Sequence, residues 1–248
     1  MTWEELAALR RQGMDLCLLP CGATEQHGPH LSVGMDTVNA TQLCEAVSRR
    51  TRVPVLPALP YGCSLGHSRR WPGTIALQPH TLADLITQIY DWVQAAGFHR
   101  LLLVNGHVGN AAALKCAVDL IRSRHDHALI RLVNVAETSA TVRAEFHADA
   151  EDWHANAAET SLMLALAPDQ VRPHKIKRAD DPDRTTGLVF THPVNRTSKN
   201  GVTGYPSRAS AAQGQALHQR MVEDLTRLVE RGRREKPPLN HSYFASVK

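Results

Sequence analysis

The chain has 248 residues, of which 43% are hydrophobic and 21% are charged, and its formal net charge is +4. This is ordinary globular composition, rich enough in apolar residues to build a sizeable core. Basic pairs are spread along the sequence with acidic residues between them, and no apolar stretch reaches the roughly 18 residues of a membrane span, so neither nucleic-acid nor membrane binding is indicated.

Strands and helices alternate in the first half of the chain. Thr2 is a predicted N-cap, with Glu5 in the capping-box position of a short helix that ends near Gln12. The following segments are predicted as a strand over 15–21, a helix over 36–50, a strand over 53–59, a long loop over 60–74 and a helix over 81–96.

The same alternation continues in the second half. The segment from His99 to Val104 is almost continuously apolar, which is typical of a buried parallel strand. The remaining predictions are helices over 111–124, 156–166 and 207–231, strands over 128–135 and 187–190, an unassigned segment over 137–151, and a tail from Lys236. We therefore expect one α/β domain over residues 1–248, with a mostly parallel sheet covered by helices on both faces.

Histidines and carboxylates are concentrated in the loop after the first predicted strand. Glu25-Gln26-His27-Gly28-Pro29-His30 follows that strand directly, and Asp36 lies a few residues further on. Loops at the carboxyl ends of strands are where α/β proteins place their chemistry. Nitrogen and carboxylate donors without a thiolate suit Zn²⁺, Mn²⁺ or Fe²⁺, so the loop predicts a metalloenzyme.

A second strand leads into a similar glycine-flanked histidine, in Asn105-Gly106-His107. Because parallel strands end at the same edge of a sheet, we expect this loop to converge with the first. Taken alone, His107 could equally be an ordinary loop or core histidine. Asn105 and Asn110 either orient the His107 loop or simply stabilise it.

A third polar segment runs from Asp152 to Ser161 and contains His154 and Glu159. If a helix begins near Asn156, Glu159 lies in its first turn and can point back towards His154. Alternatively, Asn156 and Glu159 form a capping box with no role in a site. The local sequence does not separate these two interpretations.

The motifs, taken together and in order, resemble the creatininase family of metal-dependent amidohydrolases. They cover nearly the whole chain: E-Q-H-G-P-H and then Asp36, Y-G-x-S-x-x-H (61–67), W-P-G-T (71–74), N-G-H-x-G-N (105–110), H-A-x-x-x-E-T-S (154–161) and G-V-x-G-x-P (201–206). The resemblance implies an α/β/α sandwich, commonly assembled into a homohexamer.

The resemblance also implies a dinuclear centre of Zn²⁺ and/or Mn²⁺, with Fe²⁺ possible, bridged by Asp36. The residues that match the family's metal-ligand positions are Glu25, His27, Asp36, His107 and Glu159. His154 matches a histidine near the substrate, so His154 and Glu159 are the expected catalytic residues. A hydroxide held between the metals would attack an amide carbonyl, and His154 would protonate the leaving nitrogen.

The chain departs from the family's creatinine-hydrolysing namesake at two positions. That enzyme has Tyr and Glu where this sequence has Val108 and Gly109, so we expect creatinine to be a poor substrate. His67 follows Gly66, where many members have Glu, and the roles of His67 and His30 stay open. Cys21, beside the metal loop, is expected to be a packed thiol.

The expected function is hydrolysis of a C–N bond other than a peptide bond in a small cyclic amide. Alternatives are a formamide deformylase, a family hydrolase of a ring ketone or a peptide, and a non-catalytic metal-binding subunit. Five cysteines, without C-x-x-C spacing, do not indicate a disulfide framework, and the start at Thr2-Trp3-Glu4-Glu5 does not resemble a signal peptide. A cytoplasmic location is therefore expected.

Overall fold

The centre of the fold is a sheet of three parallel strands in the order β1-β2-β3. The structure is a computed structural model that describes residues 1–67, 69–239 and 241–246. The strands are β1 (Leu16–Cys21), β2 (Arg100–Asn105) and β3 (Leu129–Asn134). Cys21 pairs in register with Asn105, and Asn105 pairs with Asn134. The three strands therefore end level, and the loops that follow them open at one edge of the sheet.

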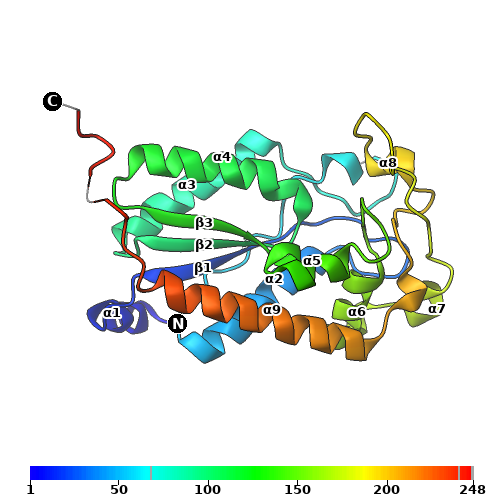
Figure 1. Cartoon of the computed structure of the whole chain (residues 1–248), viewed down its shortest axis with the longest axis horizontal. Coiled ribbons are helices and arrows are strands. Elements are labelled where there is room, and N and C mark those ends of the chain that lie inside the picture. The colour runs from blue at the N-terminus through cyan, green and yellow to red at the C-terminus, as the bar shows by residue number, and fades with distance from the viewer. Residues whose placement is uncertain (68, 240, 247–248) are drawn as a thin grey trace.

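Helices cover both faces of this sheet, as the alternating pattern predicts. On one face lie α3 (Pro79–Ala95) and α4 (Ala111–Arg124), and on the other lie α2 (Met35–Thr51) and α9 (Ala211–Gly232), as Figure 1 shows. The helix α6 (Ala157–Leu166) packs along α9. The expected α/β sandwich is confirmed. Side chains such as Leu18, Leu103 and Leu114 are fully buried between the layers.

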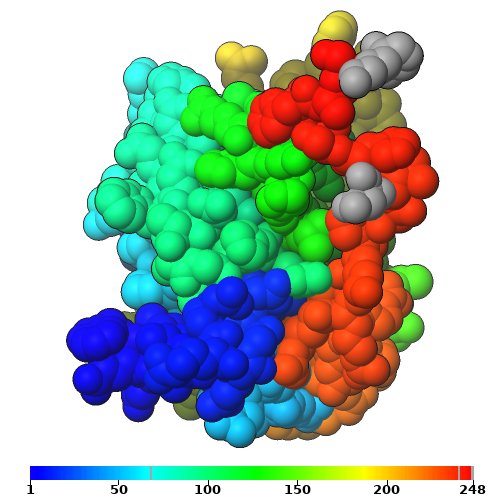
Figure 2. Space-filling view, turned by 90° about the vertical axis from the view of Figure 1, so that its left-hand side faces the viewer, coloured from blue at the N-terminus to red at the C-terminus, as the bar shows by residue number. Residues whose placement is uncertain are grey.

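The short helices lie at the two ends of the sheet. Beyond the carboxyl ends of the strands are α5 (Ala140–Phe146), α7 (Pro173–Ile176) and α8 (Val194–Thr197) (Figure 1). At the other end, α1 (Trp3–Arg11) and residues 233–239 lie on the face seen in Figure 2, beside the cyan and green middle part of the chain. None of the helices in the described ranges is both long and apolar enough to cross a membrane.

Capping side chains set the helix starts. Thr2 and Glu5 form the predicted capping box at α1. Ser139 caps α5, within the segment that the sequence left unassigned, by accepting a hydrogen bond from the Val142 N–H. The last helix begins later than predicted, because Ser210 provides the N-cap and residues 206–208 form a separate 3-10 turn.

Two predicted strands do not form. The segment 53–59 runs beside β1, but it makes only isolated parallel bridges, Leu18 with Val55 and Cys21 with Leu59. It contains Pro54 and Pro57, which have no N–H to donate to a regular ladder. The prediction over 187–190 is also wrong: the Leu188 N–H closes a turn on the Thr185 carbonyl, and the segment is exposed.

A smaller apolar cluster packs against the loop that contains residues 25–36. It joins the loop after β1 and the start of α2 to α6 and to the loop before α9, through Leu31, Met35, Ala155, Met163, Ala167, Val171, Ala179 and Val202. Burial of these side chains fixes Glu25–Asp36 against the first turn of α6. Polar residues from distant parts of the sequence are thereby held at one place.

Candidate metal centre

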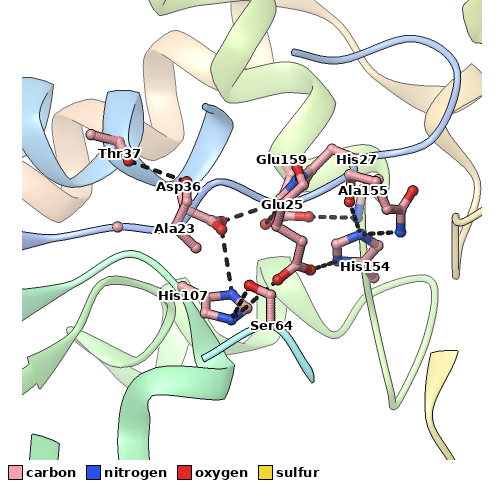
Figure 3. Close-up of polar contacts among 12 residues, drawn as sticks. Ala23, Glu25, His27, Asp36, Thr37, Ser64, His107, His154, Ala155 and Glu159 are labelled. Atoms are coloured by element: carbon pink, nitrogen blue, oxygen red, sulfur yellow. Dashed lines mark hydrogen bonds and ion pairs between the residues drawn. The ribbon is translucent and has the colours of Figure 1, made fainter. Parts of the chain in front are cut away.

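Glu25, Asp36 and His107 meet where β1 and β2 end (Figure 3). Glu25 lies in the loop after β1, Asp36 in the first turn of α2, and His107 in the loop after β2. His107 lies between the two carboxylates, with Nε2 3.1 Å from Glu25 Oε2 and Nδ1 3.3 Å from Asp36 Oδ2. All three side chains are buried. The predicted convergence of the two strand-end loops is confirmed.

His27 and Glu159 form a second group beside the first. Within this second group, Glu159 Oε1 lies 3.9 Å from Nε2 of His27. Asp36 connects the two groups, because its Oδ1 lies 3.3 Å from the same nitrogen. The Asn156 side chain caps α6 by accepting the Glu159 N–H, while Glu159 Oε2 accepts the Ala155 N–H at 2.6 Å. Asn156 therefore caps the helix, but the capping box does not form, because the Glu159 carboxylate accepts from Ala155 instead of Asn156 and points into the cluster.

His154 is oriented by the backbone of Gln26. Its Nε2 lies 2.8 Å from the Gln26 carbonyl oxygen, and a carbonyl can only accept, so Nε2 carries the hydrogen of the neutral ring. Burial, followed by the fields of His67 and His27, holds the pKa of His154 well below its ordinary value. The ring is therefore neutral near pH 7, and the lone pair of Nδ1 faces Glu25 Oε1 at 3.4 Å.

His67, to which the sequence assigned no role, belongs to the same cluster. Its Nδ1 lies 3.0 Å from Glu25 Oε1 and 3.0 Å from the side-chain nitrogen of Gln26, and its ring contacts that of His154 at 4.3 Å between centroids. The histidine of the Y-G-x-S-x-x-H motif was the available signal. His30 is placed differently, because its Nε2 bonds to Thr160 Oγ1 at 2.8 Å, on the far side of the loop.

Two asparagines hold the His107 loop. The Asn105 amide donates to the His107 carbonyl at 2.7 Å and its oxygen accepts the His107 N–H. Asn110 donates to the Gly22 carbonyl and accepts the Cys63 N–H, which ties this loop to two others. These contacts support the orienting interpretation of both residues.

The electrostatics of the protein without metal balance buried carboxylates against protonated imidazoles. Burial alone would lower the pKa of His27, but Asp36, Glu159 and Glu25 raise it to about 10. Burial would also lower the pKa of His107, but the charges of Glu25 and Asp36 outweigh it and raise this pKa. Burial raises the pKa of Glu159 to about 7. A site that draws protons onto two histidines also attracts cations, which displace those protons on binding.

The donor atoms fit divalent metal ions. Three groups each bring their ligand atoms within 4.8 Å of one another: Glu25, Asp36 and His107; His27, His154 and Glu159; and Glu25, His67 and His154. In the part of the chain that the structure describes, neither oxygen of Glu25 nor Oδ2 of Asp36 accepts a hydrogen bond, although imidazole nitrogens lie 3.0–3.4 Å away. Buried carboxylates need a positively charged partner, and a bound cation would take over this role from the protonated imidazoles.

The cluster forms the floor of a cavity of about 410 Å³. Its lining includes apolar side chains, among them Trp153, Val108, Val135 and Pro193, and charged side chains from α5 and from 151–152. This volume suits a small molecule or the end of a longer one. Cys21 is buried and does not line the cavity, and burial raises the pKa of its thiol to about 12, as expected for a packed thiol.

Comparison with known proteins identifies the family. The family model for creatininase, described as creatinine amidohydrolase, matches residues 1–229. The chain belongs to the creatininase family. A mycofactocin precursor peptide peptidase of Mycobacterium tuberculosis is 33% identical over 229 residues, which cover 86% of this chain and 84% of that protein. The creatinine amidohydrolase of Pseudomonas putida is 30% identical over 255 residues, covering 96% of both chains.

A solved creatininase confirms the fold of this family member. A mutant creatininase of the Zn-Zn type superposes with a TM-score of 0.83 at 26% identity, covering 95% of this chain and 97% of that one. The family assignment makes the chain a hydrolase, and the relatives' names span creatinine and a precursor peptide. The family alone therefore does not identify the substrate.

Proposed function

We propose that this creatininase-family hydrolase is a dinuclear metal-dependent amidohydrolase that cleaves a C–N bond of a small cyclic amide. One observation carries the proposal: Asp36 directs its two oxygens to His27 and His107, in two separate groups of buried donors, on the floor of an open cavity. A carboxylate between two nitrogen donors suits a bridging ligand. An open cavity above the donors favours a catalytic centre over a closed structural site.

The proposed ligands are Glu25, Asp36 and His107 for one ion, and His27, Asp36 and Glu159 for the other. Zn²⁺ and Mn²⁺ suit these nitrogen and oxygen donors, and Fe²⁺ would suit them as well. When bound, such ions lower the pKa of a water molecule and polarise the amide carbonyl. The solved relative of the Zn-Zn type supports two ions.

His154 is the residue proposed to move the proton. Because the Gln26 carbonyl holds the hydrogen on Nε2, the neutral ring can accept at Nδ1 the proton released by the attacking water and then donate that proton to the leaving nitrogen. Gln26 is itself fixed, since its amide oxygen accepts the Gly28 N–H at 2.9 Å and its amide nitrogen donates to the Gly201 carbonyl at 3.0 Å. His154 therefore presents the same nitrogen to the cavity throughout the reaction.

The substrate panel that tests the proposal contains cyclic imides, lactams, ureides and formamides. We expect metal-loaded protein to hydrolyse at least one cyclic member, with the His154→Gln variant slower by about 10²-fold or more because general catalysis is lost. A formamide turned over in preference to every cyclic amide would instead establish a deformylase. Absence of hydrolysis across the panel would contradict the proposal.

Peptide hydrolysis is the second candidate, because the mycobacterial relative is named a peptidase and the two chains share 33% identity. Short peptides, added to the same panel, decide between the two activities. We also propose a reducing compartment such as the cytoplasm, because all five cysteines are free thiols. A homohexamer, suggested by the family resemblance, is checked by light scattering.

A further inference from the structure

The helix α5 presents one arginine and one histidine to the cavity. Val142 and Phe146, one turn apart, are buried and anchor the helix to the core. On another side, Glu145 pairs with Arg220 of α9 at 3.1 Å. These contacts fix the rotation of the helix, so that Arg143 and His147, also four residues apart, line the cavity above the metal centre.

Among the described residues, the guanidinium of Arg143 has no partner. Within the described ranges, its side chain forms neither a hydrogen bond nor an ion pair, although Glu137, Glu151 and Asp152 line the same cavity. Glu137 is already engaged, since it accepts a hydrogen bond from Asn134 at 2.8 Å. His147 is engaged as well, because its Nε2 accepts the indole N–H of Trp153 at 3.3 Å.

The backbone, rather than Arg143, accounts for the position of the nearby acidic segment. The N–H groups of Glu151 and Asp152 both donate to the Asp183 carboxylate, at 2.9 and 3.1 Å. Burial, and then the field of Asp183, raise the pKa of Asp152. The acidic segment is therefore held by its own loop contacts, and Arg143 remains available to a ligand.

We propose that Arg143 binds a carboxylate of the substrate, so that the preferred amides carry an anionic group remote from the bond that is cleaved. This inference rests on the proposed amidohydrolase function, because it places the amide at the metal centre. The guanidinium offers two parallel N–H donors to a carboxylate, a geometry that lysine and neutral residues do not reproduce. The flat Trp153 side chain lines the same cavity.

The test compares ligands that differ in one group. The pairs are dihydroorotate with dihydrouracil, and N-formylglycine with N-formylglycinamide, each titrated by calorimetry into metal-loaded protein. We expect the carboxylate member to bind about tenfold or more tightly, as a charge-assisted hydrogen-bonded pair provides. Arg143→Gln should remove this preference, and Arg143→Lys should retain only part of it.

Arg131→Gln is the matched control. Arg131 on β3 is exposed and lines no part of this cavity. Its substitution removes the same charge as Arg143→Gln. The carboxylate preference should survive in this variant. A carboxylate preference that persists in Arg143→Gln would assign the carboxylate to the metals and overturn the inference. The inference would also be overturned if neither pair showed a preference for the carboxylate member, or if no member of either pair bound.

The two proposals can fail separately. Carboxylate-selective binding that depends on Arg143, without turnover of any amide, would support the anion site and contradict the amidohydrolase. Hydrolysis with equal affinity for charged and neutral members would do the reverse. Circular dichroism of each variant confirms that the fold is intact, which we expect because Arg143 is exposed.

Discussion

Asp36 Oδ2 lies 3.3 Å from His107 Nδ1, and this contact joins the first turn of α2 to the loop after β2. The other oxygen of Asp36 lies 3.3 Å from His27, so one buried carboxylate connects the two donor groups. The contact depends on the level ends of β1 and β2, where Cys21 pairs with Asn105. Sheet register therefore determines the geometry of the proposed metal centre.

The bridging role of Asp36 predicts that Asp36→Ala loses more metal than His154→Ala. Both ions would depend on Asp36, whereas His154 is proposed to carry a proton. The measurement is metal content by mass spectrometry after reconstitution and desalting, with Asp119→Ala on the exposed face of α4 as the control. Equal depletion in the Asp36 and His154 variants would show that His154 is a ligand.

Gly109 is predicted to tolerate no side chain. A Cβ atom there would collide with the Cys63 carbonyl oxygen and would lie 2.5 Å from Nε2 of His107. Gly109→Ala should therefore displace His107, weaken metal binding and lower the free energy of unfolding by about 1–3 kcal/mol. Thermal unfolding with and without metal measures this, and Gly34→Ala, which meets nothing within 4 Å, is the control. Unchanged metal affinity in Gly109→Ala would refute this steric account.

Creatinine is predicted to be a poor substrate. Val108 and Gly109 stand where the creatinine-hydrolysing namesake carries Tyr and Glu, and the crowding around Gly109 leaves no room for that carboxylate without a backbone shift. Loss of one protein group that stabilises the transition state commonly reduces kcat by ~10²- to 10³-fold. Steady-state kinetics on Zn²⁺- and Mn²⁺-loaded protein provide the test. A kcat/KM of ~10⁴ M⁻¹s⁻¹ or above would make creatinine a substrate of ordinary quality.

Most of the thiols are predicted to be unreactive in the folded protein. Burial raises the pKa of Cys17 and Cys21 to about 12, and it also raises the pKa of Cys44 and Cys63, so these thiols stay protonated at pH 8. Cys116 is exposed. A colorimetric thiol reagent should titrate about one thiol rapidly in native protein and all five after denaturation. Rapid reaction of several thiols in native protein would contradict the packing around β1.

The sequence predicts those parts of the fold that local patterns determine. The apolar run ending at Val104 and the capping pair of Thr2 and Glu5 are found as expected. Segments 53–59 and 187–190 were predicted from composition, but a strand also needs a partner and free N–H groups. Prolines interrupt the first of these segments, and the second lies exposed in a turn.

The candidate site likewise contains residues that sequence motifs reveal and residues that only the tertiary structure reveals. Motif order brought Glu25, His27, Asp36, His107, His154 and Glu159 forward, and the structure places them together. No local pattern shows that His67 faces Glu25, because the two residues are far apart in the sequence and only the tertiary fold brings them together. Arg143 was hidden for a related reason: only the buried Val142 and Phe146 reveal which way α5 is turned.

The central claim, that two bound metals make this cavity an amidohydrolase site, is tested most directly by one titration. Metal-free protein is titrated with Zn²⁺ or Mn²⁺ while hydrolysis of a panel substrate is followed. The account predicts no turnover without metal and a rise in rate that levels off at about two ions per chain. Turnover in the presence of excess chelator, or full activity at one ion per chain, would contradict it.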